Sequence, residues 1–117
     1  NLEASGLNRG LPLGEGTGGD IVLIANAPEG QVTHYLMGPF GKMIESKQPL
    51  QVRTPQSVKH LIVFTEYLDL AGRGYFEPSD KVMFMHRWDD VLHSLQEFHG
   101  GSAKVAVYPH AEVQYCK

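Results

Sequence analysis

The polar residues best placed to bind a small molecule lie between positions 26 and 35. This stretch reads Asn-Ala-Pro-Glu-Gly-Gln-Val-Thr-His-Tyr and follows a strongly apolar run that is typical of a strand. If a helix begins here, its free backbone N–H groups can attract an anion, and histidine or tyrosine can serve in acid–base chemistry. The ligand-facing candidates are Asn26, Glu29, Gln31, His34 and Tyr35. The alternative is an ordinary turn followed by a helix cap.

A second candidate is the junction at 85–90, which reads Met-His-Arg-Trp-Asp-Asp. Arg87 and Trp88 could clamp an anion or cover a pocket, and Trp88 is kept as a further binding candidate. The alternative makes Trp88 a core anchor, with two aspartates in the first turn of a helix, where the helix dipole favours negative charge.

Other chemistries find little support in the residue pattern. The glycine-rich stretch 14–20 precedes a strand, whereas a phosphate-binding loop follows one. The chain has six histidines and one cysteine, but none of them has the close spacing of a zinc site. No Gly-x-Ser-x-Gly elbow is present, and Cys116 lies at the end of the chain. We therefore expect no metal or cofactor bound within this chain, and we assign no catalytic residue.

Composition limits the class of protein. The chain has 117 residues, with 42% hydrophobic and 20% charged residues, which predicts one globular domain. A net charge of −3 argues against a nucleic-acid partner. No apolar run is long enough for a membrane span, and no secretory signal is visible. The lone cysteine fits a reducing compartment, so we expect a cytoplasmic protein. Because the chain begins at Asn1, we expect it to be part of a longer protein.

Apolar runs alternate with helical patterns along the chain. Strands are expected at 20–26, 61–66, 81–85 and 103–108, with helices near 31–46 and 88–99 and a further edge segment near 113–116. This alternation predicts an α/β fold, a Rossmann-like three-layer sandwich with a mainly parallel sheet of four or five strands. We expect a single domain over 19–117, preceded by a flexible glycine-rich lead-in over 1–18.

The expected helix at 88–99 carries one apolar stripe, formed by Trp88, Val91, Leu92, Leu95 and Phe98. Trp88, Leu92 and Leu95 are predicted to be buried against the sheet. Ligands of parallel sheets bind beyond the carboxyl ends of the strands, which places 26–31, 65–67, 86–88 and 108–110 along the functional edge.

Two stretches resemble a known family. The stretch 18–35, which reads Gly-Gly-Asp-Ile-Val-Leu-Ile-Ala-Asn-Ala-Pro-Glu-Gly-Gln-Val-Thr-His-Tyr, is similar to the opening of the carboxyl-terminal domain of the nickel-pincer-dependent lactate racemase family. The expected helix and strand at 88–111, which begin Trp-Asp-Asp-Val-Leu and end Ala-Val-Tyr-Pro-His-Ala, resemble the end of that domain. The resemblance covers roughly 18–112, and its middle matches poorly.

This resemblance implies a domain that closes over a substrate and is inactive alone. The nickel-pincer nucleotide would belong to an amino-terminal domain of the same protein, which would be the partner of this chain. The ligand would be a small 2-hydroxy acid. The family's Tyr-Gln-x-x-Lys pattern is not kept, and Lys42 is the nearest candidate for its lysine. The competing hypothesis is a non-catalytic Rossmann-like module for ligand binding or subunit docking.

Overall fold

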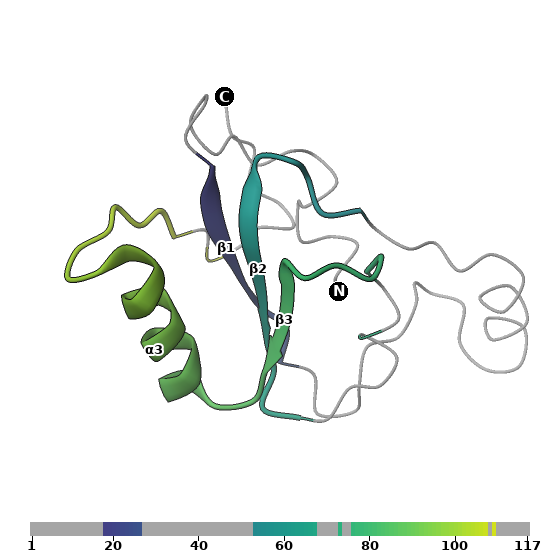
Figure 1. Cartoon of the computed structure of the whole chain (residues 1–117). Coiled ribbons are helices and arrows are strands. Elements are labelled where there is room, and N and C mark those ends of the chain that lie inside the picture. The colour runs from purple at the N-terminus through teal and green to yellow at the C-terminus, as the bar shows by residue number, and fades with distance from the viewer. Residues whose placement is uncertain (1–17, 27–52, 68–72, 74–75, 108, 110–117) are drawn as a thin grey trace, which may run out of the picture.

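The fold is seen in a computed structural model, which describes residues 18–26, 53–67, 73, 76–107 and 109. These residues form three strands and a helix, namely β1 (Gly19–Ile24), β2 (Val58–Phe64), β3 (Val82–Met85) and α3 (Trp88–His99), as Figure 1 shows. Within the described ranges, no helix is long and apolar enough to cross a membrane. The predicted elements at 31–46 and 113–116, and the lead-in up to residue 17, lie outside these ranges.

The three strands form one parallel sheet in the order β1-β2-β3. Ile21 of β1 is opposite Leu61 of β2, and Leu61 is opposite Val82 of β3. Continuous apolar runs suit such strands because a parallel sheet is covered on both faces. The α/β class and the predicted strands at 20–26, 61–66 and 81–85 are confirmed. β2 begins three residues earlier than predicted, at Val58, because its first residues alternate in burial and do not form an apolar run.

The central strand supplies the core on both faces of the sheet. Leu61 and Val63 pack with Phe76 on one face, whereas Ile62 and Phe64 pack with Val91 of α3 on the other. The β1 side chains follow the same alternation, with Ile21 and Leu23 on the Phe76 face and Val22 on the α3 face. Each face of β2 is thus covered by a residue from outside the sheet, Phe76 on one face and Val91 of α3 on the other.

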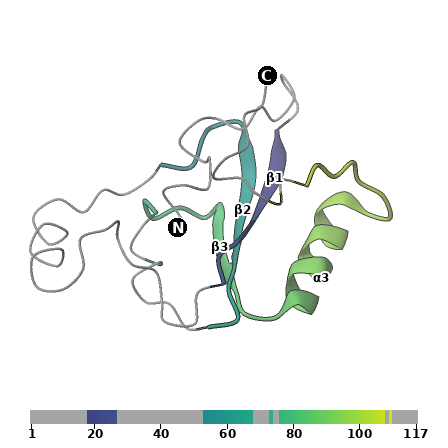
Figure 2. The ribbon, with the colours of Figure 1, turned by 180° about the vertical axis from the view of Figure 1, so that it is seen from behind.

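α3 runs antiparallel to the strands, along one face of the sheet (Figures 1 and 2). Its predicted bounds are confirmed at both ends. Asp89 and Asp90 occupy the first turn, where the positive end of the helix dipole stabilises their negative charges. The helix stops at Gly100, whose φ of 70° is in the left-handed region that glycine adopts without strain.

The predicted burial of the α3 stripe is wrong for two of its three residues. Val91 is fully buried and Leu95 packs beside it, but Trp88 is 42% exposed and Leu92 is 49% exposed. One helix packed on a sheet buries only the side chains that point directly at the sheet. Leu92 is rotated by about 100° from Val91 around the helix axis, so it flanks the contact.

Two leucines on α3 therefore make a matched pair. We expect Leu95→Ala to lower the free energy of unfolding by about 1–2 kcal/mol, because Leu95 is partly buried against the Ile62 and Phe64 cluster. Leu92→Ala should cost clearly less, since half of that side chain already meets solvent. Urea unfolding followed by circular dichroism measures both values, and equal losses would place the two leucines in the same environment.

The predicted strand at 103–108 is not present in the structure. Residues 102–107 have no regular secondary structure, and Val105 and Val107 are 79% and 78% exposed. Alternating valines favour a strand, but a strand forms only where a partner accepts its backbone hydrogen bonds. This segment has no such partner among the described residues. Its last predicted residue, Tyr108, lies outside them.

Candidate functional site

The carboxyl ends of the three strands meet at one edge of the sheet, where polar groups hold neighbouring strands together. Asn26, just after β1, accepts a hydrogen bond at its Oδ1 from the backbone N–H of Glu66, at 2.7 Å. Glu66 follows β2 by two residues, so the side-chain amide of Asn26 bridges two strand ends. Because Oδ1 is the acceptor, the side-chain NH₂ of this exposed residue has two N–H donors, for which the described residues show no acceptor.

The His86 side chain links the ends of β3 and β2 by a hydrogen bond, as Asn26 links those of β1 and β2. Its Nδ1 lies 2.7 Å from the backbone oxygen of Thr65. A carbonyl oxygen only accepts, so Nδ1 carries the proton, and Nε2 of the neutral imidazole is left as an acceptor. Nε2 is buried and has no hydrogen-bond partner among the described residues. A buried polar atom without a partner costs free energy, which makes it a candidate contact for a ligand.

Thr65 fixes the geometry of the chain between these two groups. Its side chain is buried, and its Oγ1 donates to the backbone oxygen of Tyr67 at 3.1 Å and accepts from the Tyr67 N–H at 3.3 Å. This local turn holds both the Thr65 carbonyl that orients His86 and the Glu66 N–H that orients Asn26. The end of β2 is therefore a shared anchor for one donor group and one acceptor group.

Trp88 borders this edge at the start of α3. Its ring meets the Phe64 ring edge-on, with centroids 5.1 Å apart. Part of the side chain therefore anchors the helix on the sheet, as expected if Trp88 is a core anchor. The rest is exposed beside the strand ends. Arg87 faces Asp89 at 3.7 Å in an exposed pair, which leaves the guanidinium largely in solvent.

Of the residues predicted to bind ligand, the structure describes Asn26 and Trp88. Glu29, Gln31, His34, Tyr35 and Lys42 lie outside the described residues. The individual roles of Thr65 and His86 were missed from sequence, although the rule on strand ends marked 65–67 and 86–88. The available signal was a histidine placed directly after the third apolar run.

A second polar cluster lies at the opposite edge, where the strands begin. The Asp20 carboxylate is only 3% exposed, and it accepts from His60 Nδ1 at 2.9 Å and from His99 Nε2 at 2.8 Å. The backbone N–H of His60 adds a third hydrogen bond at 3.2 Å. The His60 ring also stacks on Phe98, with ring centroids 4.0 Å apart. This cluster joins β1, β2 and the end of α3, which is the arrangement of a structural clamp.

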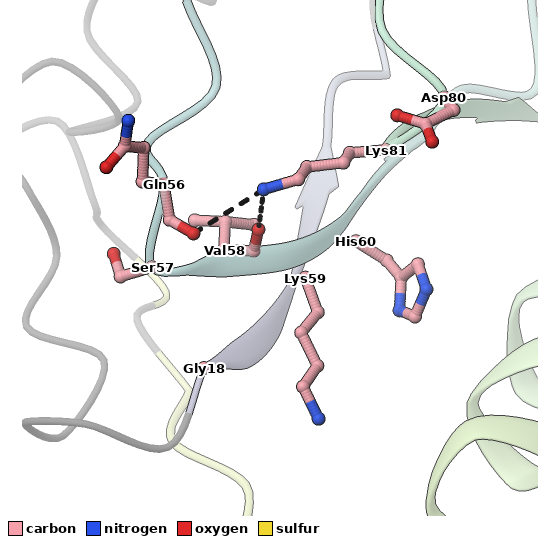
Figure 3. A pocket seen from close by; sticks show the side chains of 8 residues that line it. All are labelled: Gly18, Gln56, Ser57, Val58, Lys59, His60, Asp80 and Lys81. Atoms are coloured by element: carbon pink, nitrogen blue, oxygen red, sulfur yellow. Dashed lines mark hydrogen bonds between the residues drawn. The ribbon is translucent and has the colours of Figure 1, made fainter.

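A hollow of about 590 Å³ lies near this cluster, at the amino-terminal edge of the sheet (Figure 3). Figure 3 shows Lys81 reaching across it, where its Nζ donates to the backbone oxygens of Val58 at 3.0 Å and Gln56 at 3.4 Å. Lys59 points away from that contact, towards Gly18. With one lysine already bound to backbone, the hollow offers few convergent groups, and parallel sheets bind ligands at the other edge.

The described residues do not provide a nickel site. Within the described ranges, no group of three or more His, Cys, Asp or Glu side chains could hold a metal ion. Asp20, His60 and His99 bind one another instead, with the carboxylate as the common acceptor. The chemistry available here is binding and orientation of a ligand through hydrogen bonds at the carboxyl edge.

Comparison with known proteins adds no relative. No family model, no curated protein and no solved structure matches this chain.

Proposed function

We propose that this chain is the substrate-closing domain of a 2-hydroxy-acid racemase or epimerase similar to the nickel-pincer-dependent lactate racemases. The observation that carries the proposal is the unpartnered Nε2 of His86, held at the carboxyl edge of a parallel sheet by the Thr65 carbonyl. The motifs at 18–35 and 88–111 support the family, and the parallel α/β sheet agrees with the fold that the resemblance implies.

The hydrogen-bonding groups of the edge match those of a 2-hydroxy acid. The side-chain N–H groups of Asn26 can donate to a carboxylate oxygen, and Nε2 of His86 can accept the proton of the adjacent hydroxyl. Both groups are anchored on the backbone of consecutive residues, Thr65 and Glu66. Ligand binding would therefore need little rotation of either side chain, which favours affinity, and the atoms that cover the buried His86 Nε2 would have to move aside.

In this proposal the chain binds and orients the substrate, and another domain of the same protein supplies the chemistry. When bound in that domain, the nickel-pincer nucleotide would supply the chemistry of hydride or proton exchange at the carbon bearing the hydroxyl. Glu29, Gln31, His34, Tyr35 and Lys42 would complete the ligand contacts from the segment after β1. The complete domain would be a Rossmann-like sandwich of four or five strands in a cytoplasmic protein.

The proposal predicts a loss of binding when the edge is altered. Titration of the chain with D- and L-lactate, 2-hydroxybutyrate and malate should show saturable binding of at least one acid by calorimetry. His86→Ala and Asn26→Ala should each weaken that binding roughly tenfold, or about 1.4 kcal/mol. His93→Ala is the matched control, because His93 is exposed on α3, where it pairs with Glu97 of the same helix. Absence of binding, or equal affinity of all variants, would contradict the proposal.

A non-catalytic module is the second candidate, favoured by the exposed apolar side chains of Trp88 and Leu92 on α3. Under both hypotheses, the racemase domain and the non-catalytic module, we expect no turnover from the isolated chain. They differ when the chain is combined with the amino-terminal domain of its own protein. Racemisation of a bound 2-hydroxy acid, lost in the His86→Ala variant, supports the enzyme, whereas binding without turnover supports the module.

A further inference from the structure

The two polar groups of the proposed site are bound to the two ends of one peptide unit. His86 Nδ1 donates to the carbonyl of Thr65 at 2.7 Å. Asn26 Oδ1 accepts, also at 2.7 Å, from the N–H of Glu66, which belongs to the same peptide unit. The His86 Nδ1 and Asn26 Oδ1 atoms are therefore at most about 8 Å apart. This span suits a compact acid whose carboxylate and hydroxyl are on adjacent carbons.

An exposed apolar surface borders this peptide unit on the α3 face of the sheet. Phe64, the last residue of β2, packs on that face. Ile24 lies opposite Phe64 in the β1–β2 ladder, and Trp88 meets the Phe64 ring edge-on. Ile24 is 62% exposed and Trp88 is 42% exposed. These three residues form a surface that we call the apolar strip.

The apolar strip adjoins both polar groups. The ladder continues past the strand ends through the backbone N–H of Ala25, so Asn26 follows Ile24 on an extended chain, where residues two apart share one face. On the other side, one extended residue, Arg87, separates His86 from Trp88. Each polar group thus has a member of the strip two residues away in the chain.

The burial of His86 Nε2 favours a ligand that brings apolar surface to this strip. A ligand that reaches Nε2 must displace the atoms that cover it, which costs free energy. The ligand's carboxylate and hydroxyl give little net gain, because both are hydrogen-bonded to water before binding. A carbon substituent in contact with the strip removes apolar surface from water, and this gain grows with the area buried.

We propose that the carboxyl edge selects 2-hydroxy acids with an apolar substituent, and that Trp88 and Ile24 determine this specificity. The inference rests on the proposed function, in which the side chains of Asn26 and His86 bind the carboxylate and the hydroxyl. Trp88 contributes most, because an exposed indole packs well against an aromatic ring. The preferred substrates are therefore aromatic or branched aliphatic acids, whereas a charged substituent loses hydration on this surface.

Calorimetric titration of the whole chain with a series of acids tests this specificity. The series is lactate, 2-hydroxybutyrate, 2-hydroxy-4-methylpentanoate, 3-phenyllactate and malate. We expect affinity to rise by roughly tenfold or more from lactate to 3-phenyllactate, and malate to bind no more tightly than lactate. Trp88→Ala should lower the affinity for 3-phenyllactate about tenfold and that for lactate less than about twofold.

A second variant separates specificity from folding, because Trp88→Ala also removes a contact between α3 and Phe64. Ile24→Ala leaves α3 unchanged and should lower the affinity for 3-phenyllactate about threefold, with circular dichroism as the check on the fold. Leu92→Ala is the matched control. Leu92 is an exposed apolar residue of α3, one helical turn further from the strand ends, and its loss should leave every affinity unchanged.

The contrary outcomes separate the specificity from the proposed function. Equal affinity for lactate and 3-phenyllactate, with binding that still depends on His86, would overturn the specificity alone. A preference for 3-phenyllactate that survives both Trp88→Ala and Ile24→Ala would also overturn it, as would malate as the tightest ligand.

3-Phenylpropionate, which lacks the hydroxyl, tests the proposed function on the same surface. We expect it to bind about tenfold more weakly than 3-phenyllactate, because it has no hydroxyl proton for His86 Nε2. If it binds equally well through Trp88, with no dependence on His86, the proposed function is wrong although the strip binds apolar acids. Absence of binding of every acid would overturn both.

Discussion

Replacing Ile62 by alanine is expected to lower the free energy of unfolding by about 2–5 kcal/mol. Ile62 lies in the middle of the central strand, is completely buried, and packs with Phe64 and Val91. Removal of its side chain leaves a cavity between the sheet and α3. Hydrogen-bonded ladders on both sides hold β2 in place, so the neighbouring side chains cannot move far enough to fill this cavity.

The chain offers a control of the same residue type. Ile24 ends β1 and is mostly exposed, so Ile24→Ala should change stability by about 0.5 kcal/mol or less. Urea midpoints measured for both variants and the parent check the ranking, and an Ile62→Ala midpoint equal to that of the parent would be incompatible with a central β2.

The second large effect is expected at Asp20. Asp20→Ala should lower the free energy of unfolding by about 1.5–3 kcal/mol, because the buried carboxylate accepts hydrogen bonds from two imidazoles and one backbone N–H. Its loss leaves the donors of His60 and His99 without their acceptor and frees the end of α3 from the start of β1.

Asp80→Ala is the control, since Asp80 is exposed and its Oδ1 accepts a long hydrogen bond from the neighbouring Ser79 at 3.5 Å. The imidazole N–H signals of His60 and His99 report on the clamp directly by nuclear magnetic resonance. Both signals should exchange faster with solvent in Asp20→Ala. Unchanged signals together with parent-like stability would mean that the carboxylate does not hold the two histidines.

Local pattern was sufficient to predict the elements that this structure describes. The apolar runs around Ile21, Ile62 and Phe84 became strands because each is long enough to be buried on both faces of a parallel sheet. Helix α3 was predictable to the residue, since its acidic first turn and the glycines after His99 mark both ends.

Long-range contacts were not predictable from such patterns. Asp20 lies 40 residues from His60 and 79 residues from His99, so no spacing rule indicated that they form one cluster. The partial exposure of Trp88 likewise depends on how α3 sits on the sheet. Residues 103–107 have the pattern of a strand, but pairing depends on an edge elsewhere in the fold. At the site, Asn26 was found from its place after a strand, while the fixed tautomer of His86 needed the Thr65 contact.

The most direct test of the central claim is a map of amide shift changes while a 2-hydroxy acid is added to the ¹⁵N-labelled chain. We predict that the largest changes fall at Asn26, Glu66 and His86, at the carboxyl edge of the sheet, and that the His86 side-chain Nε2 signal moves with them. Largest changes at Lys59 and Lys81, at the amino-terminal edge, would contradict the account, as would no change anywhere in the chain.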